Sequence, residues 1–198
     1  MRSLLVHADD GAAMAGRLQT ALDIARALDA SVKLHVNTPL QRFVSMDPFG
    51  GAYLAANVVA DAQARDSALV ERLAEQMGKE DVPWMIESST IDLVDALTSS
   101  ARLADLVVVS LGSAAATRAN DSEISQLAAA LRVPLLALPP DCETMKLDGV
   151  AMLAWDGSCE ASNALRESVP LLGLASAVKL VTIADKTEGF PSTAALEY

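Results

Sequence analysis

Two carboxylates follow the first apolar stretch of the chain, and they are the first candidates for chemistry. Asp9 and Asp10 come directly after the apolar residues 3–8, where a strand would end. A carboxylate at such a position either binds the polar part of a ligand or caps the helix that follows. Asp156 stands in the same way after the apolar residues 149–155.

Other residue types that often perform chemistry are few. His7 and His35 fall inside predicted strands with no cysteine or carboxylate at ligand spacing, so we interpret them as core residues and predict no metal site. Cys142 and Cys159 lack C-x-x-C spacing and are expected to be free thiols. Ser158 lies in no G-x-S-x-G motif, and no histidine follows it, so it is expected to cap a helix. The sequence therefore predicts no catalytic residues and no enzyme.

Net charge and hydropathy argue against a nucleic-acid-binding, membrane-spanning or secreted protein. The net charge of the 198-residue chain is −11, which argues against nucleic-acid binding because phosphate contacts need clustered Lys and Arg. No apolar stretch approaches the roughly 18 residues of a membrane span. The first ten residues turn acidic too early for a signal peptide. We expect a cytoplasmic protein that binds neither membrane nor nucleic acid.

Strand and helix patterns alternate through residues 1–140, which we predict to be one complete domain. Strands are expected at 3–8, 31–36, 82–87, 106–111 and 133–138, with helices at 12–28, 53–78, 91–103 and 121–131. The breakers in 41–51 predict a loop. Because helical crossovers must cover both faces, this alternation predicts an α/β fold with an open, doubly wound parallel sheet of five strands.

Capping residues mark two of these helix starts. Ser89 or Thr90 is expected to cap the helix at 91–103, with Asp92 in its first turn. Asp121 and Ser122 are expected to open the helix that ends at residue 131.

The rest of the chain repeats the opening of the first domain. Residues 141–148 read as a linker, and 149–198 as a partial second copy with the order β-α-β. The triplet VKL ends the repeat in both copies, at 32–34 and 178–180. A unit of roughly fifty residues is too small to bury an independent core. We therefore expect a fragment of a longer protein or, failing that, a unit that docks on the first domain or on another chain.

These motifs, in this order, resemble the universal stress protein (UspA) family in its tandem two-domain form. The resemblance rests on the Asp after strand one in each half, on ADLVVVSLGS at 104–113, and on Asp121-Ser122 followed by VPLLAL at 133–138. It covers the first domain and the opening of the second. The family implies a Rossmann-like sheet of order 3-2-1-4-5 and pairing of domains along strand five.

The ATP-binding members of that family imply a nucleotide site in this chain. Their adenosine lies against the positions that match Asp9 and Val36. Their phosphates lie on a glycine pattern after strand four, where Gly112 matches the first glycine and Ser122 the closing Ser/Thr. Asp156 matches Asp9 in the second copy.

The phosphate part of this pattern is altered. Ala115 stands at the second glycine position and Asp121 at the glycine before Ser122, and the loop is about four residues short. A carboxylate at a helix N-terminus disfavours phosphate. We therefore interpret the chain as a binding and regulatory protein of the stress response with a degenerate nucleotide site. The alternative is a universal stress protein that binds ATP or AMP with slow or no hydrolysis.

Two other fold-related functions are excluded by missing residues. A phosphoacceptor receiver would need an Asp after strand three and a Lys after strand five, but Glu87-Ser88-Ser89 and Pro139-Pro140-Asp141 stand there. A dinucleotide oxidoreductase would need G-x-G-x-x-G after strand one. The free apolar edge at 133–138 predicts a homodimer, and an unidentified protein partner is expected in addition. Residues 46–54 either cover the cleft, serve as a contact surface or form a loop without a special role.

Overall fold

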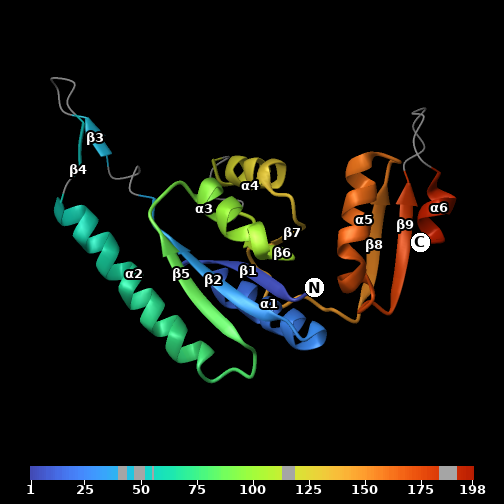
Figure 1. Cartoon of the computed structure of the whole chain (residues 1–198), viewed down its shortest axis with the longest axis horizontal. Helices are drawn as coiled ribbons and strands as arrows, with labels where there is room; N and C mark the ends of the chain where they lie inside the picture. Colours follow the sequence, from blue (N-terminus) through green and yellow to red (C-terminus); the bar gives the residue numbers. More distant parts are fainter. Residues whose placement is uncertain (40–43, 47–51, 55, 113–118, 183–190) are drawn as a thin grey trace. The chain divides into compact units, whose positions relative to one another are not determined.

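The structure is a computed structural model of the chain, and it describes residues 1–39, 44–46, 52–54, 56–112, 119–182 and 191–198. These residues form two compact units, residues 1–144 and residues 145–198 (Figure 1). The boundary falls inside the segment 141–148 that the sequence marks as a linker. No helix in the described residues is long and apolar enough to cross a bilayer.

The first unit is built on one parallel sheet (Figure 1). Its strands are β1 (Ser3–Ala8), β2 (Ser31–Asn37), β5 (Trp84–Ser89), β6 (Leu106–Ser110) and β7 (Leu135–Leu138). They lie in the order β5-β2-β1-β6-β7, and every neighbouring pair is parallel. Numbered by their position in the chain, these strands run 3-2-1-4-5, so the predicted doubly wound topology is confirmed.

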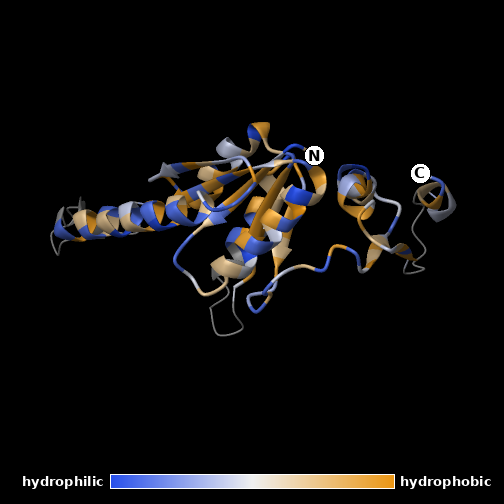
Figure 2. Cartoon of the chain, turned by 90° about the horizontal axis from the view of Figure 1, so that it is seen from below, coloured by the Kyte–Doolittle hydropathy of each residue, from blue (hydrophilic) through white to orange (hydrophobic). Residues whose placement is uncertain are grey.

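Helices cover this sheet. They are α1 (Met14–Leu28), α2 (Ala56–Met77), α3 (Leu93–Ser100) with a 3-10 turn at Ala101–Leu103, and α4 (Ala119–Ala130). One core layer joins α3 and α4 to the sheet through Leu97, Leu127, Leu5, Val107 and Val109. Because side chains alternate along a strand, the buried Leu4 and Val6 face the opposite layer. In Figure 2 the central strands are mainly hydrophobic, as expected for a sheet covered on both faces.

The segment after β7 packs closely against α1. A Cβ atom at Gly16 would lie 1.7 Å from the backbone oxygen of Cys142, so only glycine fits there. Thr144 Oγ1 also donates a hydrogen bond to Asp23 Oδ2 at 2.8 Å. Residues 142–144 therefore belong structurally to the first unit, although the sequence assigns them to the linker.

The predicted loop at 41–51 is partly wrong. The short strands β3 (Val44–Met46) and β4 (Ala52–Leu54) pair in antiparallel fashion, with Ser45 opposite Tyr53. The helix predicted from Tyr53 therefore begins later, at Ala56. The Gly and Pro residues between the two strands lie outside the described residues. Breakers in a sequence mark a turn, but they do not tell a hairpin turn from a longer loop.

The start of α3 differs from the prediction. Asp92 caps the helix, because its Oδ1 accepts the Val94 N–H at 2.9 Å, and neither Ser89 nor Thr90 does so. Ser89 is the last residue of β5 and is paired with Asn37 of β2, so its backbone is still extended. Strand pairing has overridden the local capping signal.

The start of α4 also differs. The helix begins at Ala119, two residues before Asp121. Asp121 and Ser122 therefore lie in its first turn and do not open it. Carboxylates are favourable at any position of a first helical turn, so Asp121 alone does not determine the residue at which α4 begins.

The second unit contains the predicted β-α-β order. It consists of β8 (Val150–Trp155), α5 (Cys159–Leu172), β9 (Ala177–Thr182) and a short α6 (Ser192–Leu196), with β8 and β9 parallel. Ser158 caps α5, since its Oγ accepts the Ala161 N–H at 3.0 Å. The predicted capping role of Ser158 is confirmed.

The two β-α-β segments share local hydrogen bonds at matching places. Asp9 Oδ1 accepts the N–H two residues later at 2.9 Å, and Asp156 Oδ1 does the same. The Ser31 N–H donates to the Arg2 oxygen at 2.8 Å just before β2. The Ser176 N–H donates to the Gly149 oxygen at 2.9 Å just before β9. The internal similarity of the sequence thus extends to the turns.

Candidate functional site

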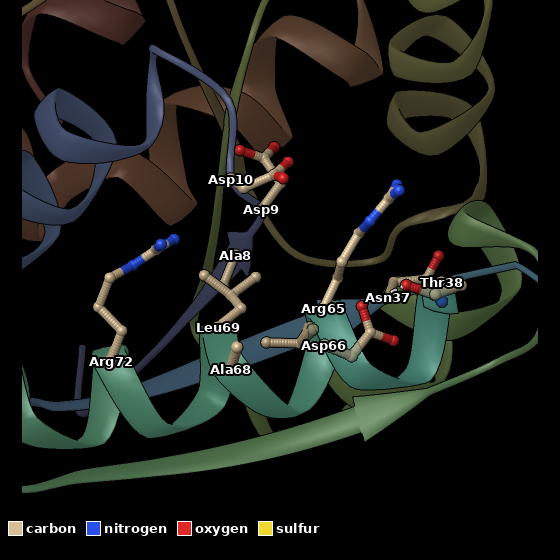
Figure 3. Close-up of a pocket in the computed structure, with 12 residues that line it drawn as sticks. Ala8, Asp9, Asp10, Asn37, Thr38, Arg65, Asp66, Ala68, Leu69 and Arg72 are labelled. Carbon is tan, nitrogen blue, oxygen red and sulfur yellow. Dashed lines mark hydrogen bonds between the residues drawn. The ribbon is translucent and has the colours of Figure 1, made fainter. Parts of the chain in front are cut away.

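A pocket of about 350 Å³ opens at the carboxyl ends of β1 and β2 (Figure 3). The strand ends contribute Ala8, Asp9, Asp10, Val36, Asn37 and Thr38, and α2 contributes Ala62, Arg65, Asp66, Ala68, Leu69 and Arg72. Parallel α/β sheets bind ligands at the carboxyl ends of their strands. The volume lies at the lower end of the range of small-molecule sites.

Strand register and one hydrogen bond bring these residues together. Ala8 of β1 is paired with Val36 of β2, so the polar residues that follow both strands lie side by side. Thr38 Oγ1 donates to Asp66 Oδ1 at 2.6 Å, which ties α2 to the end of β2. The buried Leu69 seats the same part of α2 on the sheet.

Asp9 forms the most connected polar group of the pocket. Its Oδ2 lies 2.8 Å from Arg17 Nη2 and 3.5 Å from His7 Nδ1. Its Oδ1 accepts the Gly11 N–H at 2.9 Å. Burial raises the pKa of this carboxyl, but the Arg17 charge, the His7 ring and the Gly11 amide together hold the pKa of Asp9 below its ordinary value. Asp9 is therefore ionised at neutral pH.

An ionised Asp9 can only accept hydrogen bonds from a ligand. Each carboxylate oxygen has two acceptor sites, so the contacts to Arg17 and Gly11 leave room for a ligand N–H or O–H. Its side chain is 36% exposed, so this remaining capacity faces the pocket opening. Asp9 can therefore stabilise the turn through the Gly11 N–H and also bind a ligand in the pocket.

The α2 wall is positive on balance, because it contributes two arginines, Arg65 and Arg72, and one acid, Asp66. Arg65 and Arg72 are seven residues apart, two helical turns, and therefore share one face of α2. Figure 3 shows both side chains rising from α2 toward the side on which Asp9 and Asp10 lie. Two carboxylates thus face two guanidinium groups across the pocket.

The predicted site residues do not all come together. Asp9 and Val36 line the same pocket, while Gly112 follows β6 and is not among the described residues that line it. Asp156 lies in the second unit, where it lines a separate pocket with Trp155. The backbone of Ser122 lies in α4, but its side chain, like Ala115, lies outside the described residues.

Sequence reasoning missed four charged residues of this site, one of which is Asp66 of α2. Arg17 occupies a buried position of α1 beside Leu18, and an arginine on a core face is a visible signal for a buried ion pair. Arg65 and Arg72 carry the weaker signal of a seven-residue spacing on a predicted helix, with Leu69 between them.

A second polar cluster lies between β2, β5 and α3. His35 is 3% exposed, with Nδ1 2.8 Å from Glu87 Oε1 and Nε2 2.9 Å from Ser89 Oγ. Ser100 Oγ lies 3.0 Å from the same Nδ1. His35 is thus a satisfied core histidine as predicted, and the carboxylate beside it is one that spacing along the sequence does not reveal. Glu87 is distant in sequence and reaches His35 through strand register.

The prediction that His7 is a core residue is only partly right, because its side chain is half-buried and lies beside the Asp9 carboxylate. Within the described ranges, no three His, Cys, Asp or Glu side chains are grouped as metal ligands would be.

Comparison with known proteins places the fold. No protein-family model and no curated protein matches the chain. A universal stress protein family member from Burkholderia pseudomallei aligns with a TM-score of 0.53 at 19% identity, over 69% of this chain and 95% of that chain. Universal stress protein UspA from Lactobacillus plantarum aligns with a TM-score of 0.56 at 15% identity, over 69% of this chain and 97% of that chain.

The five-stranded parallel sheet makes this a Rossmann-like α/β protein. More narrowly, its strand order and these alignments show that the chain has the universal stress protein fold. The resemblance predicted from the sequence is confirmed at the level of the fold.

Proposed function

We propose that this chain is a binding and regulatory protein of the universal stress protein type, and that its pocket takes the adenosine part of a nucleotide. One observation carries the proposal: Asp9 and Val36, the two positions that the resemblance assigns to adenosine, line the same pocket at the strand ends. The ionised Asp9 carboxylate is suited to accept a hydrogen bond from an amino or hydroxyl group of the nucleoside.

We propose that the glycine pattern after strand four, which the resemblance assigns to the phosphates, is degenerate in this chain. The sequence has an acid, Asp121, at the glycine position before Ser122, and a carboxylate near a helix N-terminus disfavours a phosphate there. We expect the second and third phosphates of ATP to add no affinity. The pocket lining contains no His, Cys or Ser among the described residues, and we propose that the protein acts by binding rather than by catalysis.

Calorimetric titration with adenosine, AMP and ATP, the last with and without Mg²⁺, tests this proposal. Adenosine should bind, and ATP should bind no more tightly than AMP. Asp9→Asn should weaken adenosine binding, while Asp141→Asn, a change of an exposed acid after β7, should not. Binding of Mg²⁺-ATP far more tightly than AMP would instead favour the ATP-binding alternative. Absence of adenosine binding at millimolar concentration would overturn the proposal.

A further inference from the structure

Two arginines in the pocket, Arg65 and Arg72, have no charged or hydrogen-bonding partner among the residues that the structure describes. Arg65 and Arg72 line the pocket from α2, and neither forms an ion pair or hydrogen bond with any described residue. Two arginines elsewhere in the first unit do form ion pairs: Arg17 with Asp9, and Arg26 with Glu80 and Asp81. Within the described part of the chain, the two α2 guanidinium groups therefore keep their N–H donors available for a ligand.

The acid that directly follows Arg65 on α2 is already engaged. Asp66 follows Arg65 directly, but its Oδ1 accepts the Thr38 hydroxyl at 2.6 Å, which fixes α2 against the end of β2. The arginines thus stand on a helix that is anchored at the pocket. An anchored pair of guanidinium forks suits a phosphate group, which accepts two parallel hydrogen bonds from each fork.

The pocket is polarised from one wall to the other. Asp9 and Asp10 lie at the end of β1, and Arg65 and Arg72 face them from α2 (Figure 3). A ligand that fits this arrangement has hydrogen-bond donors at one end and a negative charge at the other. The volume of about 350 Å³ suits one small molecule of mononucleotide size.

We propose that Arg65 and Arg72 form the anion-binding half of this pocket, and that its ligand is a nucleoside monophosphate. Its phosphate faces α2, and it does not extend toward the segment after β6. This inference rests on the proposed adenosine site. It adds the two arginines that would bind the phosphate of the nucleotide. It also accounts for how a nucleotide is held when the glycine pattern after strand four is altered.

The test compares AMP, adenosine and ribose 5-phosphate by calorimetry on the full chain. The first protein is unmodified, the second carries Arg65→Gln and Arg72→Gln, and the third carries Arg102→Gln as a control. Arg102 is exposed and precedes β6, at the opposite end of the sheet from the pocket. All three changes affect exposed side chains, so each protein is expected to fold.

The unmodified protein should bind AMP at least about tenfold more tightly than adenosine, as hydrogen bonds to charged groups allow. The double variant should lose this preference and keep its adenosine affinity, whereas the control should keep both. The affinity for AMP should fall as salt rises from about 50 to 300 mM, whereas the affinity for the uncharged adenosine should not.

The remaining outcomes separate the two proposals. Equal affinities for adenosine and AMP in the unmodified protein would overturn the arginine site and leave the adenosine site standing. A preference for AMP that survives in the double variant would place the phosphate elsewhere and would also overturn it. Ribose 5-phosphate binding as tightly as AMP, lost in the double variant, would support the arginine site and overturn the adenosine site. No binding of any of the three compounds would overturn both.

Discussion

Arg17 Nη2 lies 2.8 Å from Asp9 Oδ2, and the arginine side chain is 3% exposed while the aspartate is 36% exposed. The buried cation thus reaches a counter-charge only at the wall of the pocket. Its other described contact is the Met14 sulfur at 3.4 Å, and its Nε has no described hydrogen-bond partner. Asp9, which a ligand in the pocket would contact, therefore also compensates the charge of the buried Arg17.

Replacing Asp9 should lower the free energy of unfolding more than replacing Arg17. Asp9→Asn leaves a buried cation uncompensated, so we expect a loss of about 2–3 kcal/mol of unfolding free energy, against about 1 kcal/mol for Arg17→Met. Urea unfolding measures both, with Trp155→Phe as the background so that Trp84 alone reports on the first unit. The double variant should be more stable than Asp9→Asn alone. Strictly additive losses would show that the two side chains do not stabilise each other.

Acid should weaken the first unit through the same pair. Burial raises the pKa of Asp9, but Arg17, His7 and the Gly11 amide together lower it below the ordinary value of 3.8. The unfolded chain then takes up the proton first. This stabilisation is therefore complete above about pH 5 and is lost as the pH falls below about 4. Unfolding free energies of the unmodified protein and of Arg17→Met, compared over this range, should show a shallower slope for the variant. Equal slopes would contradict the prediction.

The buried His35 should contribute more to stability than the half-buried Lys33 on the same strand. His35→Phe removes one hydrogen-bond partner from Glu87 and one from Ser89 inside the protein, and we expect a loss of about 2–3 kcal/mol of unfolding free energy. Lys33→Gln removes a 3.3 Å contact to Glu87 at the sheet edge, and we expect less than about 1 kcal/mol. Thermal or urea unfolding distinguishes the two. Similar costs would show that the His35 cluster contributes no more than a surface ion pair.

Gly16→Ala should destabilise although alanine is the better helix former. In an exposed helix this change stabilises by about 1 kcal/mol, but here the added Cβ meets the Cys142 backbone, and we expect a net loss of about 2–3 kcal/mol. Gly173→Ala serves as the control, because the nearest atom to its added Cβ lies at 3.4 Å. A neutral Gly16→Ala variant, measured by urea unfolding, would mean that residues 142–144 separate easily from α1.

The free edge of β7 leads us to propose a homodimer. In the described sheet β7 pairs only with β6, so the backbone groups of its other edge are unpaired. Light scattering after size-exclusion chromatography should give twice the mass of the 20.7 kDa chain. A monomer at about 100 µM, a concentration at which even weak specific pairs associate, would contradict the proposal.

Strands could be predicted because their apolar runs are local signals. Leu106 to Ser110 is apolar at four successive positions, so its place in the centre of a covered sheet follows from the residues themselves. Helix starts were less predictable, since Ser89 has the side chain of a cap but is held in β5 by Asn37.

The site was predicted only in part, because its contacts join distant residues. Asp9 and Val36 could be named from the ends of two neighbouring strands. The contacts of Thr38 with Asp66 and of His35 with Glu87 depend on the packing of α2 and on strand register. Neither is encoded in the spacing of the residues along the chain.

The buried face of α2 has one further consequence. Its buried residues are Ala62, Leu69, Leu73 and Met77, while the first helical turns before Ala62 are largely exposed. Arg65 thus lies where the supported part of the helix begins. A molecule that joined Arg65 to the strand ends would slow the exchange of amide hydrogens in this part of α2. Exchange rates at these amides would therefore report occupancy of the pocket for any compound, so that a library could be screened without a label and without knowing the natural ligand.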